Sequence, residues 1–74
     1  MLLYDDGLTD GAIKVFERNV KEYPQSGNVY DSLGEAFMKA GKKDQAIANY
    51  EKALELDPKS QNAAEKLRQL KAQK

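Results

Sequence analysis

The sequence contains neither cysteine nor histidine. Without cysteine the chain has no disulfide framework and no thiolate nucleophile. Without histidine it has no imidazole base for a serine or cysteine triad and no imidazole metal ligand. The sequence therefore predicts a non-catalytic protein, with no catalytic, cofactor-binding or metal-binding residues.

The sequence also lacks an excess of positive or negative charge, and it lacks a long apolar run. The 12 basic and 12 acidic residues cancel, whereas nucleic-acid binders normally show a basic patch. Mean hydropathy is −0.78, and no segment is apolar enough to cross a bilayer or to serve as a secretory signal. We therefore expect no nucleic-acid partner and no membrane partner. The compartment is unknown, with the cytoplasm as the default.

Carboxylates are the remaining candidates for acid–base or metal chemistry. Asp5 and Asp6 are adjacent, and Glu51 and Glu55 are one helical turn apart. Paired carboxylates separate their pKa values only when they are buried together, and acidic side chains are rarely buried. The spacing of Asp5, Asp6 and Asp10 does not match a calcium-binding loop. We expect all of these side chains to be solvated.

The chain is long enough for one small domain only. A domain of 74 residues buries roughly 60% of the surface that its unfolded form exposes. Its stability should be marginal, and a two-domain enzyme or an elaborate buried active site is excluded.

The sequence repeats itself at an offset of 34 residues without gaps. Identical residues coincide in nine pairs: Gly7/Gly41, Asp10/Asp44, Ala12/Ala46, Ile13/Ile47, Glu17/Glu51, Pro24/Pro58, Ser26/Ser60, Asn28/Asn62 and Leu33/Leu67. A fixed period of this length indicates a repeat architecture.

Apolar residues within the repeat follow helical spacing, and no segment alternates with a period of two. Helices are predicted from Thr9 or Asp10 to about 22, from 28 to 40, from about 44 to 56, and from 60–62 towards 71. Asn28 is expected to cap the second helix, with Asp31 as the reciprocal acid, and Gly41 to end it. Prolines at 24 and 58 should stop the first and third helices.

These residues resemble the tetratricopeptide repeat, a family of paired helices. The family pattern of aromatic, small and proline residues is filled here by Tyr30, Leu33, Gly34, Phe37, Ala46, Tyr50, Ala53 and Pro58. The resemblance implies an all-α fold, in which antiparallel helix hairpins stack as a fragment of a right-handed α-solenoid. Gly34 and Ala46 would let the two helices of a hairpin approach closely. Phe37 and Tyr50 would fill the space between hairpins.

The resemblance divides residues 1–74, a single module, into a partial repeat (1–26), a complete repeat (27–60) and a C-terminal capping helix (61–74). Asn19 departs from the small apolar residue expected there, and residues 1–4 look like the remnant of a truncated helix. The segment 28–58 also looks similar to repeats appended to bacterial serine hydrolases. The expected function is protein–protein interaction as a scaffold. The alternative is an oligomerisation or structural appendage of a larger protein such as those hydrolases.

In this family the first helix of each repeat lines a concave face that binds a peptide or partner protein. Carried onto this sequence, the partner-binding positions are Asn28, Asp31, Glu35, Met38 and Lys39. Chaperone-binding members have lysine and asparagine where this chain has Asp31 and Glu35. Two acids would repel a peptide's terminal carboxylate, so we expect a basic or mixed peptide instead.

A second surface is suggested by the first predicted helix. Ile13, Val15, Phe16 and Val20 cannot all face one neighbouring helix. An uncovered apolar face marks an association site, so we expect self-association, as a homodimer, through these residues and the segment 2–4.

Overall fold

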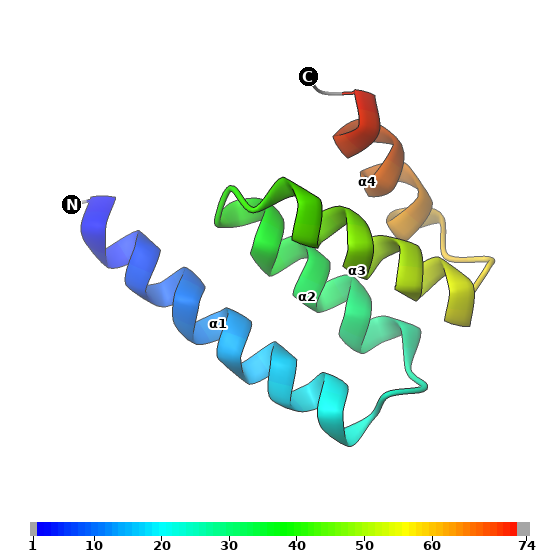
Figure 1. Cartoon of the computed structure of the whole chain (residues 1–74), viewed down its shortest axis with the longest axis horizontal. Coiled ribbons are helices and arrows are strands. Elements are labelled where there is room, and N and C mark those ends of the chain that lie inside the picture. Colours follow the sequence, from blue (N-terminus) through cyan, green and yellow to red (C-terminus); the bar gives the residue numbers. More distant parts are fainter. Residues whose placement is uncertain (1, 73–74) are drawn as a thin grey trace.

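The computed structural model describes residues 2–72, with the side chains of 10–72. This part of the chain forms helices α1 (Leu2–Glu22), α2 (Gly27–Lys39), α3 (Lys43–Leu56) and α4 (Gln61–Ala72), joined by short turns and without a strand (Figure 1). Successive helices run antiparallel. The predicted all-α architecture of stacked helix hairpins is confirmed.

Helix α1 is longer than the sequence predicted. It begins at Leu2 instead of Thr9 or Asp10 and continues without a break through Gly7 and Gly11. Each glycine inside a helix costs roughly 0.5–1 kcal/mol relative to alanine, which weakens a helix without ending it. The segment 2–4 is therefore the start of α1 and not the end of a separate helix. Met1 lies outside the described residues.

The expected cap of α2 is also corrected. The N-cap residue is Ser26, with an extended backbone and no side-chain cap hydrogen bond, and Asn28 already lies in the first helical turn. The equivalent Ser60 does act as a cap, because the amide of Ala63 donates to its Oγ at 3.3 Å. The first turn of α2 is therefore free of the capping box that the sequence suggested.

The end of α2 follows the prediction. Gly41 has a φ of +79°, in the left-handed region that glycine adopts most readily. The amide of Lys42 donates to the carbonyl of Phe37 at 2.9 Å, and the amide of Gly41 donates to that of Met38 at 3.1 Å. These two bonds form a Schellman motif, which turns the chain directly into α3.

The 34-residue period is reproduced in the hydrogen bonds of the two proline turns. In the first turn, Tyr23 N–H donates to the Asn19 carbonyl at 2.8 Å and Ser26 N–H to the Tyr23 carbonyl at 3.1 Å. In the second turn, the corresponding bonds of Asp57 and Ser60 are 2.8 and 3.0 Å. The step from α1 to α2 is thus repeated in the step from α3 to α4.

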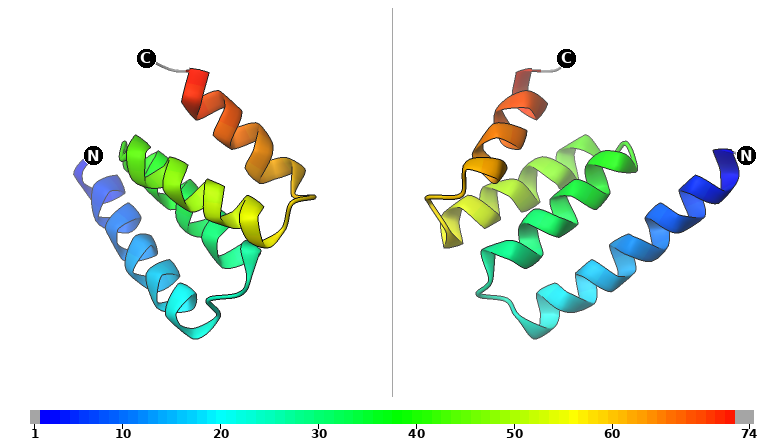
Figure 2. Two further views of the ribbon diagram at one scale, coloured as in Figure 1. Left: turned by 45° about the vertical axis from the view of Figure 1, so that its right-hand side comes forward. Right: turned by 180° about the vertical axis from the view of Figure 1, so that it is seen from behind.

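The core lies around the α2–α3 hairpin, with α1 on one side and α4 on the other (Figure 2). Tyr50 and Ala46 of α3 are completely buried. A Cβ atom added to Gly34 would lie 3.1 Å from three atoms of the Tyr50 ring, so the absence of a side chain at Gly34 lets the ring pack there. The predicted close packing at Gly34 is thus confirmed, whereas the close approach expected at Ala46 stays a prediction. Tyr50 was expected to fill the space between hairpins. The structure shows its ring packed within the α2–α3 hairpin.

The buried apolar side chains come from all four helices. Leu33, Ala36 and Phe37 of α2 join residues of α3, while Ile13 of α1 and Ala63 and Leu70 of α4 close the two sides. Burial of these side chains provides the main favourable free energy of folding. The core therefore holds α2 between α1 and α3 and leaves its remaining surface for other contacts.

Candidate functional site

The predicted partner-binding residues share one face of α2. Because they are spaced by three and four residues, they follow the same side of the helix. Asn28, Glu35 and Lys39 are exposed, whereas Asp31 and Met38 are half-buried, with Met38 packed against the core. Asn28, Asp31, Glu35, Met38 and Lys39 together are called the candidate face below.

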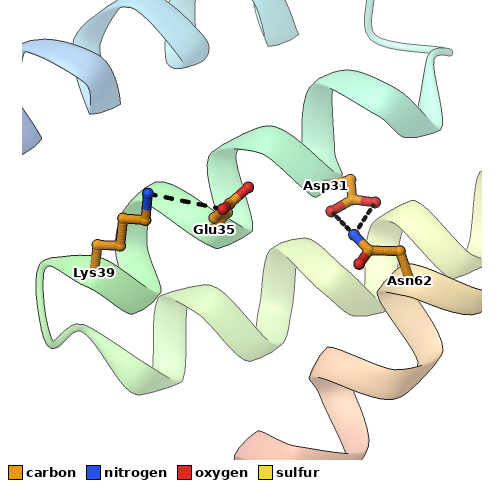
Figure 3. Close-up of polar contacts among 4 residues, drawn as sticks. All are labelled: Asp31, Glu35, Lys39 and Asn62. Atoms are coloured by element: carbon orange, nitrogen blue, oxygen red, sulfur yellow. Dashed lines mark hydrogen bonds and ion pairs between the residues drawn. The ribbon is translucent and has the colours of Figure 1, made fainter.

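Asp31 connects this face to α4. The side-chain amide of Asn62 donates to both carboxylate oxygens of Asp31, each at 3.1 Å (Figure 3). This contact was not predicted from the sequence, although the repeat pattern contains a signal for it. Asn62 occupies the same position in its repeat as Asn28, so it belongs to the corresponding face of the next helix. The candidate face therefore extends from α2 onto the start of α4.

Glu35 and Lys39 form an ion pair one turn apart on the same face (Figure 3). The Lys39 Nζ and the Glu35 Oε2 are 3.8 Å apart, and the side chains are 68% and 51% exposed. An ion pair this long and this well solvated contributes little to stability. Both side chains are accordingly available to an incoming ligand.

Tyr50 packs on Gly34, which lies between the two acids of the candidate face in the sequence of α2. Burial, then the negative charges of Asp31 and Glu35, raise the pKa of its hydroxyl to about 12. The hydroxyl oxygen is buried and makes no hydrogen bond within the described part of the chain. Tyr50 therefore stays neutral under physiological conditions and keeps an unused hydrogen-bonding capacity next to two carboxylates.

The four residues expected to mediate self-association do not form one exposed surface. Ile13 is buried, and Phe16 and Val20 are half-buried against the core. Val15 points away from this packed side and is 57% exposed. Because Ile13, Phe16 and Val20 pack in or against the core, Val15 is the most exposed of the four residues. The side chains of residues 2–4 lie outside the described ones.

Other hollows lie along α1, along α4 and at the turn after α1. One hollow along α1 is lined by Lys14, Glu17, Arg18 and Lys21, and another along α4 by Gln61, Ala64, Glu65 and Arg68. Tyr23 is 60% exposed in the turn after α1. None of these surfaces combines a buried polar group with charged side chains, which distinguishes the candidate face from them.

Groups for metal or redox chemistry are not assembled in residues 10–72. No cluster of three or more acidic side chains is placed to hold a metal ion there. None of the helices described is both long and apolar enough to span a bilayer.

Comparison with known proteins gives two findings. Residues 27–60 match the family model described as Tetratricopeptide repeat. Over 58 residues, the chain is 38% identical to the "Cellulose synthase operon protein C" of Escherichia coli (strain K12) and to the "Putative cellulose synthase operon protein C" of Escherichia coli O157:H7. The matched region covers 78% of this chain but 5% of either relative. The family match coincides with the segment that the structure shows as α2, α3 and the turn that follows.

Proposed function

This chain belongs to the tetratricopeptide repeat family, whose members generally mediate protein–protein interaction, and we propose that it is a non-catalytic interaction module. A peptide or a segment of a partner protein binds across α2 and α4, on the concave face of the repeat. The observation that carries this proposal is the candidate face itself. Its polar side chains are grouped on one side of α2, whose other side packs into the core, and Asn28, Glu35 and Lys39 are exposed.

The charge of the candidate face supports a basic or mixed partner. Asp31 and Glu35 contribute two negative charges, and Lys39 contributes one positive charge. Complementary charges across an interface favour the right partner and raise the association rate. A peptide that offered only its terminal carboxylate would meet repulsion from both acids.

Nuclear magnetic resonance of the isotope-labelled chain tests the proposal. The protein is titrated with three pools of random acetylated and amidated decapeptides, which are basic, neutral or acidic. The basic pool is expected to shift the amide signals of Asp31, Glu35 and Asn62 more than those of the α1 residues Lys14 and Arg18. If no pool shifts the signals of the candidate face, the proposed function is wrong.

An oligomerisation or structural role within a larger protein, such as a bacterial serine hydrolase, is the second candidate. One observation favours it: the relatives carry the matched region as a small part of a long chain. In this role, α1 would form the contact and Val15 would lie within it. Self-association is measured by light scattering over a wide concentration range.

A variant of Val15 separates association from folding. Val15→Asp is expected to abolish a concentration-dependent dimer without loss of helical signal, because the side chain is exposed. Phe16→Asp is less informative, since it places a charge against the core and unfolds the chain. A constant monomer mass for the unmodified chain would rule out this second role for the isolated module.

A further inference from the structure

The two outer helices of the stack each lack a neighbour that their equivalents have inside it. At the 34-residue offset, α1 corresponds to α3 and α4 corresponds to α2. Helices α2 and α3 pack against each other, whereas α1 packs mainly on α2 and α4 mainly on α3, at opposite ends of the described chain (Figure 2). Each outer helix therefore has a free side that corresponds to one half of the α2–α3 contact.

The free side of α1 is visible in the exposure of its residues. Three residues of α3 that share one side by helical spacing are buried: Ala46, Tyr50 and Ala53. Tyr50 packs on Gly34 of α2, so this is the side that α2 covers. The equivalent residues of α1 are only half-buried: Ala12, Phe16 and Asn19. Within the described chain, no helix covers this side of α1 as α2 covers α3.

The segment at the start of α1 does not fold back over this side. In the complete repeat, residues 36–42 end α2 and turn into α3, with Gly41 at a φ of +79°. The equivalent residues 2–8, which include Gly7, are helical and belong to α1. They continue α1 along its own axis, so the cover for its free side has to come from another helix.

The free side of α4 carries a hollow at the corresponding place. The hollow is lined by four residues: Gln61, Ala64, Glu65 and Arg68. Gln61 and Arg68 occupy the positions that Gly27 and Gly34 have in α2. Helix α3 packs on both of these glycines, because a Cβ atom added to them would lie 3.2 and 3.1 Å from atoms of α3. The hollow on α4 is therefore the place where a helix like α3 would lie.

We propose that α1 of one molecule packs into the hollow on α4 of a second copy, so that the two helices complete a repeat built from two molecules. The contact reproduces that of α3 with α2, with Phe16 in the place of Tyr50 and Arg68 in the place of Gly34. This inference rests on the second candidate function, oligomerisation, and specifies its partner and surfaces. Because the two surfaces differ, each pair keeps one of either kind free, and the contact generates a head-to-tail series that grows beyond the dimer.

Arg68 keeps this contact weak. The packing at Gly34 leaves no room for a side chain, so an arginine at the equivalent position holds the two helices further apart. A contact between two single helices is also smaller than a standard protein interface. Association is therefore expected at high protein concentration.

A variant that copies the inner repeat tests this role of Arg68. Arg68→Gly should lower the concentration of half-maximal association about tenfold, because it removes the obstructing side chain. Gln69→Gly is the matched control, since Gln69 is also exposed on α4 but does not line the hollow. It weakens the helix by the same amount and should leave association unchanged.

Sedimentation of the 74-residue chain, from dilute solution to about 1 mM, measures the association. The mean mass of the unmodified chain should rise past that of a dimer. Ala12→Arg obstructs the surface of α1, and Ala64→Arg obstructs the hollow. Ala12 lies outside the core cluster and Ala64 is exposed, so both variants should keep the helical signal in circular dichroism. Ala48→Arg, exposed on α3, is the control and should associate like the unmodified chain.

Mixing the two obstructed variants identifies the geometry. Ala12→Arg and Ala64→Arg should each remain monomeric, whereas an equimolar mixture should form a dimer and nothing larger, because one intact surface of each kind is present. A mixture that stays monomeric would overturn the proposal, and so would equal effects of Arg68→Gly and Gln69→Gly. If Ala64→Arg associates on its own, the α4 hollow is not the surface and oligomerisation through α1 alone stands. A constant monomer mass for the unmodified chain would show that both are wrong.

Discussion

The contact between Gly34 and Tyr50 predicts an unusual cost for adding one methyl group. In Gly34→Ala, the new Cβ would lie 3.1 Å from the Cδ2, Cε2 and Cζ atoms of the Tyr50 ring. The ring has little room to move, because Tyr50 is completely buried. Overpacking of this kind costs about 1–3 kcal/mol. Alanine also improves the helix by about 1 kcal/mol over glycine, so we expect a net loss of roughly 0–2 kcal/mol.

A matched substitution separates the two contributions. Gly11 also lies inside a helix, but it is exposed and a Cβ there would meet nothing within 4 Å. Gly11→Ala should therefore stabilise the chain by about 0.5–1 kcal/mol. The free energy of unfolding is measured by urea denaturation followed by circular dichroism. If Gly34→Ala is stabilised as much as Gly11→Ala, the tight packing of Tyr50 on Gly34 is refuted.

Three further predictions concern the hydroxyl, the bond between helices and the core. Because the pKa of Tyr50 is raised to about 12, the folded state holds this proton more tightly than the unfolded state, whose pKa is 10.0. The free energy of unfolding should hence fall as the pH rises from about 10 to 12, and Tyr50→Phe should remove that part of the fall in pH-dependent urea titrations. Asn62→Ala should destabilise the chain by about 1 kcal/mol through loss of its bonds to Asp31, whereas Asn28→Ala, at the equivalent position of the preceding repeat, should change little. Leu70→Ala should cost about 2–5 kcal/mol, seen as a lower urea midpoint, since Leu70 is only 2% exposed; a smaller loss would mean that α4 is not firmly docked.

Much of the fold follows from local rules in the sequence. The 34-residue offset, Gly41 and the two prolines define α2, α3 and the turns around them, because these residues restrict the backbone directly. The start of α1 was missed because Gly7, Thr9, Asp10 and Gly11 together look like a helix boundary. The structure shows that the helix continues through these residues, because each of them weakens a helix without ending it.

The candidate site was only partly predictable for a different reason. Positions 28, 31, 35, 38 and 39 follow from helical spacing together with the family resemblance. The Asp31–Asn62 contact joins residues that are 31 positions apart, and the isolation of the Tyr50 hydroxyl depends on the atoms around it in three dimensions. Local patterns place residues on a face, but they do not show what a neighbouring helix brings to that face.

The order in which the helices touch has a consequence for cooperativity. The main contacts are α1 with α2, α2 with α3 and α3 with α4, so the chain behaves approximately as a one-dimensional row of units. Opening of α1 therefore breaks a single interface and leaves the bonds between Asp31 of α2 and Asn62 of α4 intact. A partly open molecule with α1 detached thus keeps the residues of the candidate face in place. Ligand binding to this face would stabilise the remaining helices α2, α3 and α4 against complete unfolding.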